Sequence, residues 1–314
     1  MILAAALLAG CGPAVAPSEP LPAVDGARAL EETARVVALG PRVAGTAGAE
    51  RAAAYLVERL AALGLEPRLD RFEEEAPAGR MTFRNVSARL PGSEAGLVLL
   101  VSHYDTKGDV APDFAGANDS GSSTGLLLEL ARVLRAQRRG PELEFLFVDG
   151  EECRVAYGPR DGLHGSRRRA AQLRASGEAR QVRAVLVLDM IGDRDLTVTL
   201  PRNGTPALLR AILAAAEEEG LRDRFRLGDG AILDDHVPFL EAGLPAVDLI
   251  DFEYGIGPSD NRYWHTPDDT LDKLSADSLE RIGRVVLRFL RAVGENGASR
   301  PPSRFSLVPG RVER

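Results

Sequence analysis

The chain has 314 residues, of which 45% are hydrophobic, so it is long enough to bury a substantial core in one large domain. Its formal net charge is −7. This acidic balance argues against a nucleic-acid-binding protein, because neutralising phosphates requires Lys and Arg clustered on one face. We therefore expect no nucleic-acid partner.

Residues 1–25 have the pattern of a processing segment followed by a Pro/Ala-rich tether. An apolar run ends in the sequence LAGC at residues 8–11, which resembles a bacterial lipobox with Cys11 as the lipidated residue. An ordinary secretory signal or an apolar tail is the alternative. We expect an exported bacterial protein, lipid-anchored at the cell envelope or periplasmic. The anchor would be its only membrane contact, since no other stretch has the ~20 apolar residues that span a bilayer.

Residues 26–296 are expected to form a single catalytic domain, followed by a C-terminal tail at 297–314. Two stretches near its start have apolar residues at helical spacing and end in Gly, the usual helix-stop residue, and two later stretches alternate with a period closer to two. The predicted helices are 26–40 and 45–64, and the predicted strands are 66–75 and 81–92.

From residue 97, short apolar runs typical of a sheet buried on both faces alternate with helical segments. This alternation predicts an α/β three-layer sandwich, with a mainly parallel, mixed central sheet flanked by helices. The predicted strands are 97–101, 143–148, 184–188 and 246–250, and the predicted helices are 122–137, 165–176, 206–220 and 275–294.

Polar residues gather where these runs end, and ligands bind beyond the carboxyl ends of the strands in such sheets. Taken singly, Asp119 could be a helix cap, Asp189 a turn residue and His265 an ordinary loop histidine. Taken together, they favour one metal site at one edge of the sheet. The candidates are His103 with Asp105, Asp119, Glu151 with Glu152, Asp189 and His265.

Two imidazoles and three carboxylates suit zinc, which would also neutralise the acidic cluster at the end of the 143–148 strand. Glu151 and Glu152 are adjacent, so they cannot easily bind one metal with the same geometry. One of them should be a ligand, and its neighbour should act as general acid and base.

This ordered set resembles zinc metallopeptidase family twenty-eight, which holds co-catalytic zinc aminopeptidases and glutaminyl cyclases, and the resemblance covers about residues 28–294. It implies that Glu151 is the proton shuttle and that Asp105 orients His103. It also implies an α/β fold like that of the zinc aminopeptidases. The implied zinc ligands are Asp119, Glu152 and His265, joined in the aminopeptidases by His103 and Asp189 around a second zinc that Asp119 bridges.

Several stretches favour the cyclase branch, which uses one zinc and converts an N-terminal Gln to pyroglutamate with release of ammonia. The stretches 102–108 and 233–250 are similar to the cyclase versions, in which Asp234 corresponds to a catalytic carboxylate hydrogen-bonded near Glu151 and the equally catalytic Asp189. Trp264 matches an indole that packs on the substrate Gln.

Tyr157 stands where animal cyclases have Trp in the substrate pocket, which is a departure from the cyclase pattern. His164 and His236 are assigned to structure, since each is expected to open a helix. Two alternatives remain: an aminopeptidase with two zincs that hydrolyses the first peptide bond, and a non-catalytic peptide-binding relative. In each case the partner is the N-terminus of a peptide or protein.

Overall fold

The computed structural model describes residues 20–136, 140–257 and 259–295. Cys11 and the predicted tail at 297–314 lie outside these residues. One eight-stranded sheet with the order β1-β2-β4-β3-β5-β8-β6-β7 runs through the molecule. The strands are β1 (Pro67–Ala76), β2 (Gly79–Leu90), β3 (Glu94–His103), β4 (Pro141–Val148), β5 (Val182–Asp189), β6 (Val198–Leu200), β7 (Phe225–Leu227) and β8 (Ala246–Ile250).

The middle of the sheet is parallel, since β4, β3, β5 and β8 pair in parallel as neighbours. At one side β2 pairs antiparallel with β4 and with β1, and at the other side β6 pairs antiparallel with β8. The predicted mixed, mainly parallel sheet is confirmed. Because the four parallel strands point the same way, their carboxyl ends meet at one edge.

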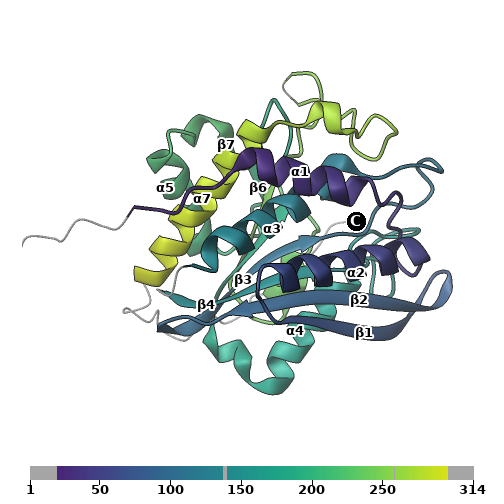
Figure 1. Ribbon diagram of the computed structural model, residues 1–314, viewed down its shortest axis with the longest axis horizontal. Coiled ribbons are helices and arrows are strands. Elements are labelled where there is room, and N and C mark those ends of the chain that lie inside the picture. Colours follow the sequence, from purple (N-terminus) through teal and green to yellow (C-terminus); the bar gives the residue numbers. More distant parts are fainter. Residues whose placement is uncertain (1–19, 137–139, 258, 296–314) are drawn as a thin grey trace, which may run out of the picture.

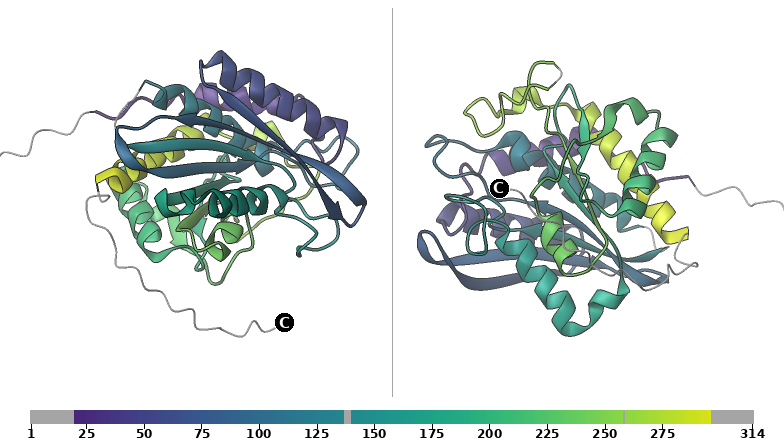
Figure 2. Two further views of the ribbon diagram at one scale, coloured as in Figure 1. Left: turned by 90° about the horizontal axis from the view of Figure 1, so that it is seen from below. Right: turned by 180° about the vertical axis from the view of Figure 1, so that it is seen from behind.

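Helices cover both faces of the sheet (Figures 1 and 2). The five helices α1, α2, α3, α5 and α7 share one core with the sheet, and α4 and α6 share a second core on the opposite face. The helices are α1 (Gly26–Val37), α2 (Ala47–Ala62), α3 (Ser123–Leu134), α4 (His164–Ser176), α5 (Pro206–Glu218), α6 (His236–Glu241) and α7 (Ala276–Glu295).

Alternation along the central strands explains why both faces are covered. In β3, Val98 and Leu100 lie in the first core, whereas Leu97, Leu99 and Val101 lie in the second. Successive side chains of a strand point to opposite faces, so a continuous apolar run needs an apolar layer on each side. This is the physical basis of the three layers.

The helices and strands predicted from the sequence are present, with ends displaced by a few residues. Strands β6 and β7 were not predicted, because each has only three residues and three residues carry no readable periodicity. Within the part of the chain that the structure describes, no helix is both long and apolar enough to cross a membrane.

Candidate metal centre and active site

Two strand ends and a turn form the first potential metal triad. His103 is the last residue of β3 and Asp189 the last residue of β5, while Asp119 lies in a π-helical turn, Ala117–Ser122, that leads into α3. The His103 Nε2 atom is 3.2 Å from Asp119 Oδ1 and 3.3 Å from Asp189 Oδ1. All three side chains are buried.

A second triad shares Asp119 with the first. The His265 Nε2 atom is 3.2 Å from Asp119 Oδ2 and 3.0 Å from Glu152 Oε1. One ligand atom from each of these three residues lies within 4.8 Å of the others, and the same holds for the first triad. The two oxygens of Asp119 therefore face different histidines, which is the arrangement of a carboxylate able to bridge two metal ions.

The electrostatics of both triads favour a bound cation. Burial raises the pKa of Asp119, but hydrogen bonds from His103 and His265 outweigh it and hold that pKa well below its ordinary value. Burial lowers the pKa of His265, but Asp119 and Glu152 outweigh it and raise the pKa to about 10. The carboxylates thus attract positive charge strongly. Imidazole nitrogens and carboxylate oxygens at these separations fit zinc.

Glu151 lies beside the metal triads but belongs to neither. Its side chain is buried, and Oε1 accepts a hydrogen bond of 2.9 Å from the Tyr157 hydroxyl. Burial, and then the charge of Glu152, raise the pKa of Glu151 well above its ordinary value. The structure therefore gives adjacent glutamates different surroundings, and only Glu152 faces a histidine of the metal centre.

Asp105 holds the backbone of the glutamate pair. Its two carboxylate oxygens accept hydrogen bonds from the backbone amides of Glu151 at 3.1 Å and Glu152 at 3.2 Å. Asp105 Oδ1 also lies 3.5 Å from His103 Nδ1. This carboxylate therefore lies beside His103, the residue that the family resemblance implies it orients, and it also fixes the backbone of the glutamate pair, which that resemblance did not suggest.

Trp264 contacts the candidate metal centre by packing on His265, the next residue in the chain. Its ring stacks on the His265 ring, with centroids 4.1 Å apart and planes 24° apart, and Phe252 packs on it at 5.3 Å. The indole is partly exposed. An aromatic surface is thus available beside the His265 imidazole.

Asp234 is close enough to Glu151 to act on its charge, but no hydrogen bond between these two carboxyl groups is found among the described residues. The charge of Asp234 helps to raise the pKa of both Glu151 and Asp189, the latter, chiefly through burial, to about 7. Asp234 Oδ1 accepts the backbone amide of Asp235 at the start of α6, and the carboxyl group shares a hydrogen bond with Asp248.

The two remaining described histidines open helices, as predicted. His164 begins α4, its Nδ1 lies 2.7 Å from Glu74 Oε2, and its ring stacks on Phe83 with centroids 4.1 Å apart. These contacts give it a structural role. His236 begins α6 and is fully buried, yet neither ring nitrogen has a hydrogen-bond partner among the described residues.

Three residues that support the site were not identified from the sequence. Asp269 accepts the backbone amides of Asn118 and Asp119, and Lys107 Nζ lies 3.3 Å from Glu152 Oε2. Arg42 is fully buried and donates to the backbone carbonyls of Tyr104, next to Asp105, and of Ala115 and Gly116, just before the turn that holds Asp119. Asp269 and Lys107 each follow a predicted site residue by a few positions, and that proximity was the available signal.

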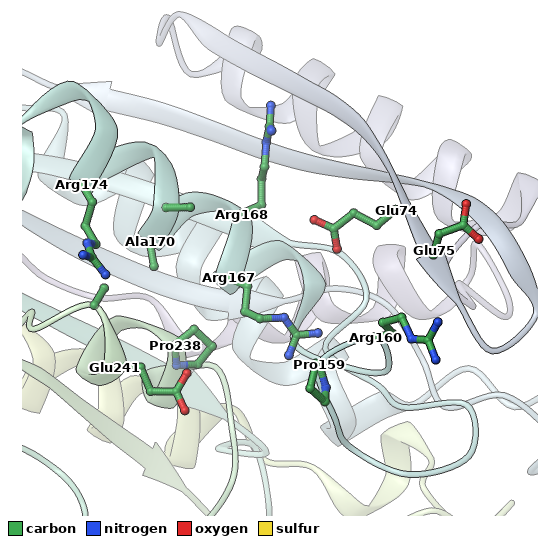
Figure 3. A pocket seen from close by; sticks show the side chains of 12 residues that line it. Glu74, Glu75, Pro159, Arg160, Arg167, Arg168, Ala170, Arg174, Pro238 and Glu241 are labelled. Carbon is green, nitrogen blue, oxygen red and sulfur yellow. The ribbon is translucent and has the colours of Figure 1, made fainter.

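A hollow of about 620 Å³ lies away from these ligands, against α4 and α6 (Figure 3). Its arginines and glutamates are mixed, and Arg168 is already paired with Asp70. None of the candidate metal ligands lines it. The hollow is therefore separate from the candidate metal centre at the carboxyl edge of the sheet.

Comparison with known proteins places this arrangement in a family, since the model of peptidase family M28 matches residues 85–290. The chain belongs to peptidase family M28. A glutaminyl-peptide cyclotransferase from Drosophila melanogaster is 30% identical over 282 residues, which cover 80% of this chain and 78% of that protein.

Solved structures of this M28 protein's relatives agree with the sequence comparison. A glutaminyl cyclase from an Acidobacteriales bacterium has a TM-score of 0.84 at 36% identity, covering 90% of this chain and 99% of that one. A Zn-dependent exopeptidase from Parabacteroides distasonis has a TM-score of 0.76 at 25% identity, covering 88% and 99%. The M28 protein is thus an enzyme of the glutaminyl-cyclase-like type, and the predicted fold class is confirmed.

Proposed function

We propose that the protein is a zinc-dependent glutaminyl-peptide cyclotransferase, which acts on peptide N-termini and converts Gln to pyroglutamate. The observation that carries the proposal is the position of Glu151, a buried carboxyl group beside the metal triads but outside them. The similarity to glutaminyl cyclases over most of the chain supports this branch of the family.

In this reaction the α-amine nitrogen of the substrate attacks the side-chain amide carbon of its own Gln, and ammonia leaves. A zinc ion held by Asp119, Glu152 and His265 would polarise that amide carbonyl. Glu151 takes a proton from the attacking amine and returns it to the departing nitrogen. Its raised pKa suits both transfers near neutral pH, and the Tyr157 hydroxyl holds its Oε1 in place.

We assign the substrate pocket to Trp264 and Tyr157, with the indole packing on the Gln side chain. The stacking of Trp264 on His265 supports this assignment, since it sets the indole beside a proposed zinc ligand. Trp264→Ala should raise KM for Gln-initiated peptides about tenfold, the size of a lost aromatic contact, with little change in Tm. Unchanged kinetics would remove Trp264 from the pocket.

An aminopeptidase is the second candidate, because His103, Asp119 and Asp189 complete a second metal triad. Two peptides, one beginning with Gln and one with Leu, separate the candidates by mass spectrometry. The cyclase proposal expects loss of ammonia from the first peptide and no change in the second. Release of free Leu without loss of ammonia would assign the site to peptide hydrolysis with two zincs. If neither peptide reacts with the zinc-loaded protein, a non-catalytic relative is supported instead.

We also propose export from a bacterial cell with a lipid on Cys11, supported by the LAGC sequence at residues 8–11. Mass spectrometry of the N-terminal peptide from the native host tests this directly. A lipidated Cys11 as first residue is expected, and Cys11→Ser should move the protein from the membrane fraction to the soluble fraction. An unmodified Cys11 in the mature protein would contradict the anchor.

A further inference from the structure

A carboxylate interrupts the apolar layer between the sheet and α6. Asp248 is the middle residue of β8, where it pairs with Val187 of β5. Its strand neighbour Ala246 and Val187 both belong to the core that contains Phe239 of α6. Alternation along β8 puts Asp248 on this same face. A fully buried acidic side chain therefore occupies a position that suits an aliphatic residue.

Two other polar residues join Asp248 without satisfying it. Asp234 is 3% exposed, and His236 and Asp248 are 0% exposed. Within the described ranges, no N–H or O–H group of another residue bonds to the Asp248 oxygens or to Asp234 Oδ2, and neither ring nitrogen of His236 has a partner. The Asp248 carboxyl shares a hydrogen bond with Asp234, which requires a proton on one of these two acids. Because a buried polar atom without a partner costs about 1–3 kcal/mol, the two ring nitrogens of His236, next to two carboxyl groups bonded only to each other by a shared proton, call for a missing ligand.

The spacing of these atoms fits a metal ion. One ligand atom from each of Asp234, His236 and Asp248 lies within 4.8 Å of the other two, and His236 Nδ1 is 3.9 Å from Asp248 Oδ2. Ligands bound to one ion at about 2.0–2.2 Å must lie within about 4.4 Å of one another, so small side-chain adjustments close the site. Two carboxylates and one imidazole suit zinc and similar divalent ions.

The charge of the buried carboxylates also favours a bound metal ion. Asp235 adds a third buried carboxylate next to Asp234, and a hydrogen bond with Ser166 only partly offsets the effect of burial, which raises the pKa of Asp235. No ion pair with Lys or Arg is found for these three carboxylates in the described part of the chain. Burial, and then the charge of Asp234, raise the pKa of Asp248 well above its ordinary value. A cation would offset this repulsion.

We propose that Asp234, His236 and Asp248 form a separate, buried site for a divalent transition-metal ion, with zinc as the expected occupant. The site shares no residue with the two triads around Asp119. Its function is to hold α6 against β8 and to keep Asp234 in a fixed place near Glu151. It does not depend on whether the catalytic centre forms pyroglutamate or hydrolyses peptides.

The test is the zinc content of the full-length protein, purified from zinc-supplemented cells and measured after acid digestion. Asp248→Asn and His236→Gln should each lower the content by about one ion per chain relative to the wild type. Asp251→Asn is the matched control: Asp251 is also buried and follows β8 directly, but its oxygens already accept the backbone amides of Thr197 and Glu253. Its zinc content should equal that of the wild type.

Unchanged zinc in folded Asp248→Asn and His236→Gln proteins would overturn the proposal, and the cluster would then be held by shared protons. If the variants fail to fold, the wild-type crystal decides. Diffraction data at the zinc absorption edge should show an anomalous peak between His236 and Asp248, in addition to any peak at Asp119. A peak at Asp119 alone overturns the buried site and leaves the proposed cyclase activity untouched.

Discussion

Buried carboxylates at the two ends of β4 have different partners. Near the beginning of the strand, Glu144 is 1% exposed, and its Oε2 atom lies 2.7 Å from Arg169 and 3.1 Å from Arg89. Beyond the other end, Glu151 and Glu152 are nearly as buried, yet no arginine pairs with them in the described structure. Burial raises the pKa of each of these two glutamates.

This difference in partners indicates a structural role for one end of β4 and a chemical role for the other. A guanidinium is always charged and neutralises Glu144 permanently, so that end can only be structural. At the other end, His265 faces Glu152, and Lys107 Nζ lies 3.3 Å from Glu152 Oε2. The Glu151 side chain accepts a hydrogen bond from the Tyr157 hydroxyl and, among the described residues, forms no ion pair. Imidazole can give up its proton and bind a metal, which leaves the carboxylates available for chemistry.

The largest expected effect separates the adjacent glutamates. Glu151→Gln should lower kcat for Gln-initiated peptides about 10³-fold, because Gln cannot carry the proton, with no loss of zinc. Glu152→Gln should lower the zinc content by about one ion per chain, because it removes a charged ligand. Steady-state kinetics and metal analysis of both proteins measure this.

Each of these variants is the control for the other, since the substitution is the same and the positions are neighbours. Loss of zinc in Glu151→Gln with retention in Glu152→Gln would exchange the two roles. Equal zinc loss in both would mean that the pair acts as one acidic patch.

A smaller effect is expected at the arginine-paired end. Arg169→Met keeps the aliphatic stem but leaves the buried Glu144 with Arg89 alone, and should lower the free energy of unfolding by about 2–3 kcal/mol. Urea denaturation measures this, and zinc content should not change. Arg281→Met, which breaks an exposed pair with Asp277, should cost about 0.5 kcal/mol or less. Equal losses in both variants would show that burial of Glu144 does not matter.

The smallest effect concerns pH. Burial raises the pKa of Asp251 to about 7, above the ~3.9 of an unfolded Asp. The folded state therefore binds the extra proton, so this stabilising contribution is complete below about pH 4 and is lost as pH rises through 7. The free energy of unfolding of the wild type, minus that of Asp251→Asn, should fall by about 1–2 kcal/mol between pH 6 and 8.

Denaturation at several pH values measures this difference, in which contributions from the metal centre cancel if both proteins carry the same zinc. The charges of Asp193 and Glu253 act in the same direction as burial. A difference that stays flat, or that rises with pH, would contradict a raised pKa for Asp251.

Local sequence was enough to predict the order of the longer helices and strands, though not β6 and β7, and the edge of the sheet at which the candidate metal ligands lie. Apolar runs such as 97–101 are readable because a strand with two covered faces must be apolar throughout. Polar residues directly after such runs, including His103 and Asp189, are placed by topology, since parallel strands share one carboxyl edge.

Only the tertiary structure decided how these side chains meet. Asp119 directs one oxygen to His103 and the other to His265, and Asp269 accepts its backbone amide. His265 and Asp269 follow Asp119 by about 150 residues, so these contacts depend on how distant segments of the chain pack. The sequence also could not show that His236 and Asp248 receive no hydrogen bond from an N–H or O–H group of the described residues around them. This depends on which side chains the fold brings next to them. Periodicity records which face of an element is buried, whereas the partner of a buried polar atom is set by the packing of distant segments.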